Sequence, residues 1–264
     1  MIKKDELTRI AEAKRLSLEN AEKDYLLELL LFAIYSEFGD MLILKGGTCL
    51  YKMYSLNRFS QDLDFTLNKR RFDLERFLSK IMKSLNLLGI EGKVKDIERY
   101  KNEINVRLNF KGPLYDGRKE SLSLIILNIS LREKVLKEIR KELLTPMYRE
   151  IPSFEIFVMN EQEILTEKVR AILTRNRARD VYDLWFLLKK GVNLDFNTIN
   201  KKLKTYGTSF SSSYFDKKIE EKERFWETDL RGLLIGKLPS FSLIRKEILD
   251  MLRKATRSHK KLTS

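Results

Sequence analysis

Apolar and polar positions follow two different periods along this chain. Between residues 18 and 38 apolar positions recur at helical spacing, which predicts a helix packed into the core. Strict alternation replaces that period at Asp62–Leu67, Glu103–Phe110 and Leu122–Leu131, and it predicts strands with one apolar face. Beyond residue 160 the helical period returns and persists. The pattern therefore indicates a region of mixed helices and strands followed by a helical region.

The same reasoning places each predicted element. Helices are expected at 5–15, 18–38, 48–54, 71–88, 161–175, 179–190, 195–204, 214–236 with a break, and 241–257, and strands at 41–44, 62–67, 103–110, 122–131 and 154–159. Prolines at 146 and 152 mark a boundary between two domains, 1–150 and 151–264. The stretch 207–213 is expected to be a flexible loop and the basic tail 253–264 to be disordered. The expected fold class is α+β, with a mixed sheet flanked by helices and a helical C-terminal domain.

Composition narrows the chemistry open to such a fold. The chain has 264 residues, enough for two domains, and a net charge of +14 that favours polyanionic partners such as nucleic acid. Cys49 is the one cysteine and His259 the one histidine, which argues against disulfide frameworks, zinc sites and histidine-based catalysis. No apolar run is long enough to span a membrane and no signal peptide is apparent, so a cytoplasmic protein is expected.

Two carboxylates on one strand are the strongest candidates for chemistry. Asp62, Asp64 and Thr66 project from one face of the predicted strand, and apolar residues project from the other. The two carboxylates stand roughly 7 Å apart at the backbone, by the rise of a strand. Like charges this close repel one another. A hard cation with oxygen ligands, above all Mg²⁺, would stabilise them and leave coordination positions open for phosphate oxygens.

A diglycine turn precedes this strand. Gly46 and Gly47 let a ligand approach the backbone closely, and Thr48 is a residue type that caps helices. The N-terminus of the helix that follows would present N–H groups to an anion. Glycines before a helix often form a turn and nothing more. Together with the carboxylate strand shortly after it, however, the turn predicts a site for a polyphosphate and its metal ion.

A second set of charged residues lies in the helical half. Lys168 falls in an apolar stripe, so either its stem packs while its ammonium reaches water, or the ammonium contacts the phosphates held by the diglycine turn. Asp180 and Asp183 lie one turn apart on a helix that should be buried. Pairing with Arg175 or Arg179 is the structural interpretation of these carboxylates, and a role in a site is the other.

These residues resemble the AbiEii/AbiGii toxin family of nucleotidyltransferases. The resemblance rests on four segments in the expected order, which are Gly46-Gly47-Thr48, the run with Tyr54, Arg58 and Ser60 that leads to Asp62-Leu63-Asp64-Phe65, Lys168, and Arg179-Asp180-Val181-Tyr182-Asp183-Leu184. The resemblance implies the minimal nucleotidyltransferase fold related to DNA polymerase beta.

The resemblance also implies roles for individual residues. The residues implied to bind nucleotide are Gly46, Gly47, Thr48, Ser60 and Lys168, those implied to bind Mg²⁺ are Asp62 and Asp64, and Asp183 or Asp180 is implied as an active-site carboxylate. Related enzymes usually carry a third carboxylate on a further strand, where this chain has Asn128. That departure is compatible with one principal metal ion, with a supporting residue from elsewhere, or with reduced activity.

The predicted function is Mg²⁺-dependent transfer of a nucleotide from a nucleoside triphosphate. The resemblance narrows the acceptor to RNA, most of all tRNA 3′ ends, so that translation stops, in a bacterial toxin–antitoxin or phage-defence pair with a separate antitoxin protein. Two alternatives remain open: the same fold acting on a small molecule or a protein, and a basic RNA-binding module without catalysis. The sequence does not determine the transferred nucleotide, the acceptor or the oligomeric state.

Overall fold

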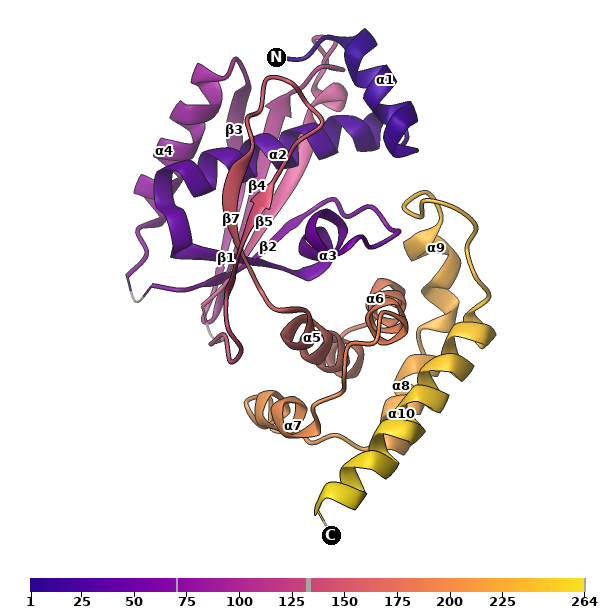
Figure 1. The fold of residues 1–264 in the computed structure, drawn as a ribbon. Helices are drawn as coiled ribbons and strands as arrows, with labels where there is room; N and C mark the ends of the chain where they lie inside the picture. Colours follow the sequence, from indigo (N-terminus) through magenta and orange to yellow (C-terminus); the bar gives the residue numbers. More distant parts are fainter. Residues whose placement is uncertain (70, 132–133, 264) are drawn as a thin grey trace. The chain divides into compact units, whose positions relative to one another are not determined.

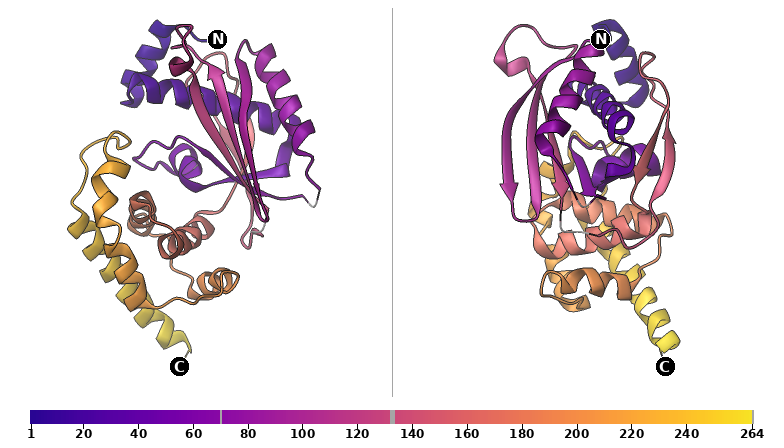
Figure 2. Two further views of the ribbon diagram at one scale, coloured as in Figure 1. Left: turned by 180° about the vertical axis from the view of Figure 1, so that it is seen from behind. Right: turned by 90° about the vertical axis from the view of Figure 1, so that its left-hand side faces the viewer.

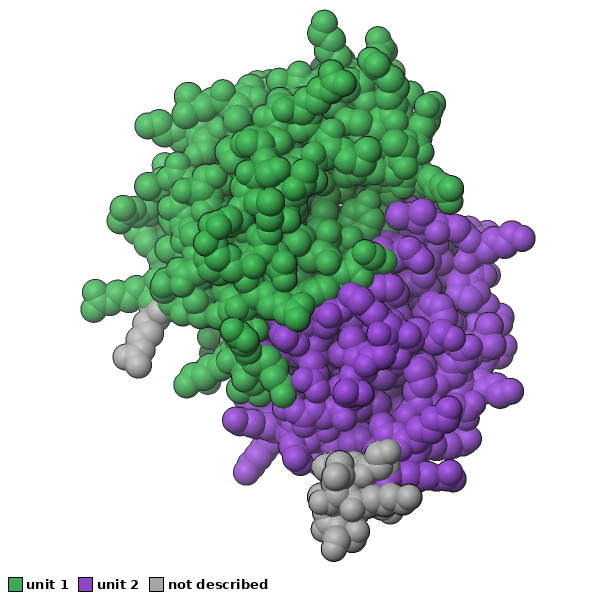
Figure 3. Space-filling view, in the orientation of Figure 1, with its two compact units in different colours: residues 1–55, 59–159 green, residues 56–58, 160–264 purple. Residues whose placement is uncertain are grey.

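The computed structural model describes residues 1–69, 71–131 and 134–263, with side chains up to residue 257 in the last helix (Figure 1). Contacts divide the chain into two compact units, which Figure 3 distinguishes by colour. Unit 1 comprises Met1–Ser55 and Phe59–Met159, and unit 2 comprises Leu56–Arg58 and Asn160–Ser264. The division at residue 150 stays a prediction. No helix in the described part of the chain is long and apolar enough to cross a membrane.

The described part of unit 1 contains one mixed sheet. Its strands are β1 (Leu42–Lys45), β2 (Leu63–Leu67), β3 (Glu91–Tyr100), β4 (Glu103–Lys111), β5 (Ser123–Ser130), β6 (Arg140–Leu144) and β7 (Phe154–Val158). They lie in the order β3-β4-β5-β2-β1-β7-β6. The β2–β5 and β1–β7 pairs are parallel, and the other neighbours are antiparallel. The predicted α+β class with a mixed sheet is confirmed.

Helices of unit 1 cover the apolar face of this sheet. They are α1 (Lys4–Lys14), α2 (Leu18–Phe38), α3 (Gly46–Tyr54) and α4 (Leu74–Leu87), with short 3-10 turns at Gly39–Met41 and Lys119–Ser121. In Figure 2 α2 and α4 lie against the curved sheet. Ser17 caps α2 and Asp73 caps α4 through side-chain oxygens that accept backbone N–H bonds. Because α2 is buried along most of its length, it supplies much of the core of this unit.

Fully buried and half-buried residues alternate along β5, and the half-buried ones mark the face of the sheet that can carry a functional site. Ile125, Leu127 and Ile129 are fully buried, while the residues between them are half-buried. The same alternation in β2 buries Leu63 and Phe65 and leaves Asp64 half-buried. Asp64 and Asn128 therefore share the face that is opposite the apolar core of unit 1.

Two strands were not predicted from the sequence. β3 and β6 are the two edge strands of the sheet, and most of their residues are charged or exposed. Charged edge strands protect a sheet from pairing with other chains, and they also lack the alternation that identifies a strand. The other strands and the four helices agree with the predicted positions to within a few residues.

Unit 2 is helical throughout its described part. Its helices are α5 (Glu161–Thr174), α6 (Ala178–Lys189), α7 (Phe196–Lys204), α8 (Ser212–Glu220), α9 (Trp226–Leu230) and α10 (Phe241–Thr263), with a 3-10 turn at Glu223–Phe225. Trp226 packs edge-on against Phe241, with ring centroids 5.3 Å apart. Residues 56–58 join this unit through a bond of 3.0 Å from the Ile235 N–H to the Asn57 carbonyl.

The expectation of a disordered tail was wrong for its backbone. α10 continues to Thr263, so the basic residues after 253 extend a helix. The side chains beyond residue 257, His259 included, and residue 264 lie outside the described part of the structure.

Candidate active site

The diglycine turn forms the junction between β1 and α3. α3 begins at Gly46, and its N-cap residue, Lys45, makes no capping bond with its side chain. The first turn of the helix contains no acidic side chain. Free N–H groups and the positive end of the helix dipole meet at this terminus, which therefore suits an anion such as a phosphate.

Gly46 lies directly against the carboxylate of Asp64. Its φ of +70° is in the left-handed region, which side chains other than glycine rarely adopt. A Cβ added at this position would lie 3.0 Å from both Cβ and Cγ of Asp64, and closer still to its Oδ2. No side chain larger than hydrogen fits here without displacing Asp64. The structure thus brings the predicted phosphate turn and one predicted metal ligand into contact.

Asp64 has a hydrogen-bonded neighbour on the adjacent strand. In the parallel β2–β5 pair Asp64 lies opposite Asn128, whose Nδ2 donates to Asp64 Oδ1 over 3.0 Å. On the other side, the antiparallel β1–β2 pair places Lys45 opposite Asp64. Lys45 is 8 % exposed, so a largely buried lysine is the register partner of Asp64 on β1, as Asn128 is on β5.

Asp62 lies in the bend just before β2 and is half-buried. Its backbone carbonyl accepts a hydrogen bond from the Thr48 hydroxyl, which is fully buried. The prediction that Thr48 caps the helix was wrong, because α3 begins two residues earlier and Thr48 instead ties α3 to the start of β2. Leu63 is buried between the two aspartates. Asp62 lies just outside β2, so its place beside Asp64 on one side of the chain stays a prediction.

The remaining predicted residues of unit 1 are buried around this junction. Gly47 lies within the first turn of α3, and Ser60 is 6 % exposed in the segment that leads to β2. The Tyr54 hydroxyl donates to the Met159 carbonyl over 3.0 Å, so Tyr54 secures the end of α3. These positions shape the turn and the strand, and their binding roles stay predictions.

The carboxylate oxygens at this site fit a Mg²⁺ ion that is coordinated by both the protein and a nucleotide. Among the described residues no group of three or more Asp, Glu, His or Cys side chains could hold a metal ion by itself. Asp62 and Asp64 supply hard carboxylate oxygens, and Mg²⁺ is commonly held by one or two carboxylates with substrate phosphates and water. The helix terminus at Gly46 lies against Asp64, where it could accept the phosphates of that nucleotide.

The predicted residues of unit 2 form a buried ionic network. Lys168 Nζ lies 2.9 Å from Asp180 Oδ1 and 2.6 Å from Asp183 Oδ2. Arg175 also binds Asp180, with its Nε 2.8 Å from Oδ2. Arg58 binds Asp183 through two bonds, Nε to Oδ1 at 2.9 Å and an Nη to Oδ2 at 2.8 Å. The Lys168 ammonium thus points to carboxylates within the unit, which rules out the interpretation that it extends into water.

Electrostatics keep all members of this network charged. Burial acts to lower the pKa of Lys168, but the carboxylates of Asp180 and Asp183 outweigh burial and raise the pKa. Burial acts to raise the pKa of both carboxylates, yet the cations lower it, chiefly Lys168 and Arg175 for Asp180 and Arg58 and Lys168 for Asp183. Sequence reasoning named Arg175 as a structural partner but assigned no partner to Arg58.

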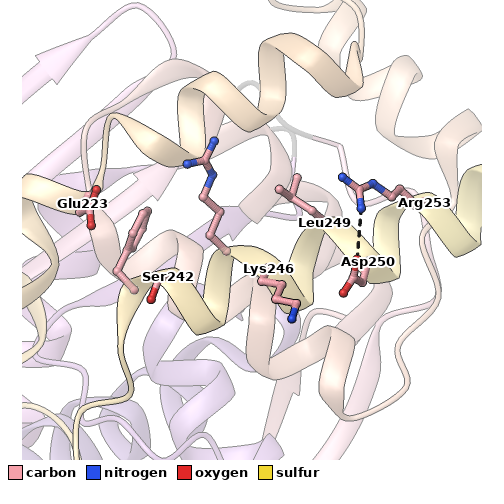
Figure 4. A pocket seen from close by; sticks show the side chains of 8 residues that line it. Glu223, Ser242, Lys246, Leu249, Asp250 and Arg253 are labelled. Atoms are coloured by element: carbon pink, nitrogen blue, oxygen red, sulfur yellow. Dashed lines mark hydrogen bonds and ion pairs between the residues drawn. The ribbon is translucent and has the colours of Figure 1, made fainter.

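Two shallow cavities on unit 2 lie along α10, apart from this network. One has a volume of about 280 Å³ and is lined by Lys246, Leu249 and Arg253, among others (Figure 4). The other, about 400 Å³, shares Leu249 and Arg253 and continues to Arg257. Figure 4 shows Arg253 paired with Asp250 on the same helix. This face of α10 carries exposed arginines but none of the predicted site residues.

Comparisons with known proteins agree with this architecture. The model of the family described as "Nucleotidyl transferase AbiEii toxin, Type IV TA system" matches residues 29–254. JHP933 from Helicobacter pylori is 22% identical, with 94% of this chain and 98% of that chain covered and a TM-score of 0.61. MenT4, a nucleotidyltransferase toxin from Mycobacterium tuberculosis H37Rv, is 18% identical, with 97% and 90% covered and a TM-score of 0.66. At these identities both structures support the fold alone. A search of curated proteins found no match.

Proposed function

This chain belongs to the AbiEii family of nucleotidyltransferase toxins of type IV toxin–antitoxin systems, and from that premise we propose that it transfers nucleotides to RNA at tRNA 3′ ends. In this proposal Asp62 and Asp64 hold Mg²⁺, and the turn at Gly46 holds the triphosphate. A toxin of such a system has a cognate antitoxin. Modification of the tRNA end would block translation, which accounts for toxicity.

The contact between Gly46 and Asp64 carries this proposal. A polyphosphate bound at the start of α3 would lie beside a carboxylate that has a hard oxygen to offer a cation. The missing side chain at Gly46 leaves the space that the Asp64 carboxylate occupies, directly beside the start of α3. Bound Mg²⁺ would offset the charge that develops on the phosphate oxygens during transfer.

The transfer also requires a group that removes the proton of the acceptor hydroxyl. Asp64, Asp183 or the metal ion itself would help to remove it. Asp183 is fully buried, paired with two cations and lowered in pKa, so it is a weak proton acceptor. Asp64 is half-buried and keeps an oxygen outside its bond to Asn128. That oxygen is also the proposed metal ligand, so Asp64 would favour loss of the proton through the Mg²⁺ that it holds, and we assign a positioning role to Asp180 and Asp183.

Lys168 remains the proposed contact to the departing pyrophosphate. An ammonium has three N–H groups, and Asp180 and Asp183 use two of them. The third is left for a phosphate oxygen. The two carboxylates keep Lys168 charged and fix the direction of its ammonium. The ammonium could therefore bind a phosphate without a change in the side-chain conformation.

RNA is the proposed acceptor because the protein is strongly basic. The net charge is +14, and phosphate neutralisation supplies most non-specific affinity for nucleic acid. Arg253 and Arg257 lie exposed on α10, beside the cavities of that helix. We propose that this face contacts the RNA backbone.

Incubation with each α-labelled nucleoside triphosphate, Mg²⁺ and total RNA tests the proposal. We expect label in the tRNA size class from one or a few nucleotides, and its loss when the tRNA 3′ end is blocked. Asp64→Asn should abolish labelling, and Asp40→Asn, at an exposed carboxylate of the same unit, should preserve it. Label on a protein band or a small molecule would instead support the first alternative. RNA binding without nucleotide turnover would support the non-catalytic alternative.

A further inference from the structure

We propose that Asn128 limits the active site to a single divalent cation by holding one oxygen of Asp64, where a third carboxylate would admit a second ion. The inference rests on the proposed function, because it concerns the metal ion that Asp62 and Asp64 would bind. It assigns Asn128 a positioning role: its amide sets how Asp64 is presented.

The backbone fixes the two side chains in place. Asp64 and Asn128 are register partners in the parallel β2–β5 pair, and the same face continues to Asn105, the partner of Asn128 on β4. Neighbouring strands lie about 4.7–4.9 Å apart, which brings opposed side chains on one face within range of direct contact. The observed 3.0 Å bond from Asn128 Nδ2 to Asp64 Oδ1 is therefore a consequence of strand register.

The chemistry of the amide fixes which atom faces the carboxylate. An ionised carboxylate only accepts hydrogen bonds, so the NH₂ group of Asn128 must face Asp64. The opposite orientation would place two acceptor oxygens against each other. The NH₂ group carries partial positive charge, and a cation next to it would be repelled. Asp64 Oδ1 is thus held by a donor, and Oδ2, which lies against Gly46, is the oxygen left for a metal ion.

A second ion would lack ligands. Two-metal sites hold their ions about 3.5–4 Å apart, and shared or additional carboxylate oxygens offset the combined charge. The described residues contain no cluster of three or more acidic or other ligating side chains. Along the row from Asp64, the next two positions are the amides of Asn128 and Asn105. These three register partners across β2, β5 and β4 therefore include one carboxylate, and two metal ions would need further carboxylate ligands.

Counting Mn²⁺ ions bound per bound nucleotide tests this inference without measuring activity. The protein is titrated with Mn²⁺ in the presence of a triphosphate analogue that has a non-cleavable α,β-methylene bridge, and free Mn²⁺ is measured by electron paramagnetic resonance. We expect one Mn²⁺ per protein-bound nucleotide for the wild type. Asn128→Asp replaces the donor by a carboxylate of the same size, and we expect it to raise the number to two.

Asn109→Asp is the matched control. It adds one carboxylate on the same face of the sheet, half-buried on β4 opposite Lys93, but away from Asp64. This variant should bind one Mn²⁺ per protein-bound nucleotide, as the wild type does. Asn128→Leu removes the bond that orients the Asp64 carboxylate and adds no ligand, so we expect about tenfold weaker Mn²⁺ binding at an unchanged number of ions and unchanged thermal unfolding.

The outcomes separate this inference from the proposed function. Two ions per nucleotide in the wild type, or one in a folded Asn128→Asp protein, would overturn the role of Asn128 and leave the function intact. Absence of both nucleotide and Mn²⁺ binding in the wild type would overturn the proposed function. If Asn128→Asp does not fold, an unchanged Mn²⁺ affinity in Asn128→Leu would be sufficient to reject the inference.

Discussion

Arg58 and Asp183 form a buried two-point ion pair, although they are 125 positions apart in the chain. Both side chains are almost inaccessible to solvent. The guanidinium fork matches the two oxygens of the carboxylate, so the pair fixes direction as well as distance. It joins the segment 56–58 to α6 within unit 2, and it places Asp183 where it also binds Lys168.

Arg58→Ala should therefore destabilise unit 2 strongly. Removing one partner of a buried ion pair leaves an uncompensated charge and costs about 3–5 kcal/mol. Arg231→Ala, which breaks an exposed pair with Glu227 in the same unit, should cost less than about 1 kcal/mol. Urea unfolding of both variants measures the difference. Equal effects of the two substitutions would show that the buried network does not stabilise this unit.

Acid should weaken unit 2 through the same network. The pKa values of Asp180 and Asp183 are lowered in the folded protein from an ordinary value of 3.8. Their stabilising contribution is therefore complete above about pH 4 and is lost as the pH falls towards the folded values, because the unfolded chain takes up protons first. Each carboxylate adds at most about 1.4 kcal/mol per pH unit to the slope of the unfolding free energy against pH.

The unfolding free energy of Asp183→Asn should accordingly fall less steeply than that of the wild type between pH 4 and pH 2, because the variant lacks a carboxylate that takes up its proton on unfolding. Urea midpoints measured across this range give the two slopes. A variant with the wild-type slope would mean that Asp183 is not the paired, lowered carboxylate described above.

Gly46→Ala should block nucleotide binding. The added Cβ would meet the Asp64 carboxylate and would also force alanine to adopt a φ of +70°. Gly39→Ala is the matched control, since Gly39 has a φ of +51° but nothing within 4 Å of an added Cβ. Both variants should lose about 1–2 kcal/mol of stability from the left-handed backbone. We expect nucleotide affinity to fall at least tenfold in Gly46→Ala only, and similar losses in both would mean that backbone strain causes the effect.

Charge reversal on α10 should weaken binding of RNA. The Arg253 side chain is 71% exposed, and Arg257 follows one turn later. If each contacts a phosphate, Arg253→Glu with Arg257→Glu should lower the slope of log affinity against log salt by about 2. Lys69→Glu with Lys141→Glu, at two exposed lysines of unit 1, changes the net charge by the same amount and serves as the control. An identical slope in both proteins would place the RNA elsewhere.

Sequence periodicity predicted the elements that bury apolar residues and failed for the strands that are mostly exposed. α2, α5 and α6 were placed by their apolar stripes, and β2 and β5 by alternation. β3 and β6 are charged edge strands and gave no such signal.

Contacts between distant segments were also beyond the sequence. The bond from Asn128 to Asp64 depends on the register of a parallel pair, which no local pattern specifies. The partner of Arg58 is on another helix of its unit, far along the chain. The role of Thr48 was misjudged because its hydroxyl reaches the carbonyl of Asp62 instead of the turn of its own helix.

The central claim is that the carboxylates of Asp62 and Asp64 and the turn at Gly46 bind a metal–triphosphate together. Isothermal titration with the α,β-methylene analogue, with and without Mg²⁺, measures this most directly, in the wild type, Asp64→Asn and Asp40→Asn. We predict tight binding by the wild type and Asp40→Asn with Mg²⁺ only, and at least a hundredfold weaker binding by Asp64→Asn, from the loss of a charged ligand. Equal affinity with and without Mg²⁺, or in Asp64→Asn, would contradict the account.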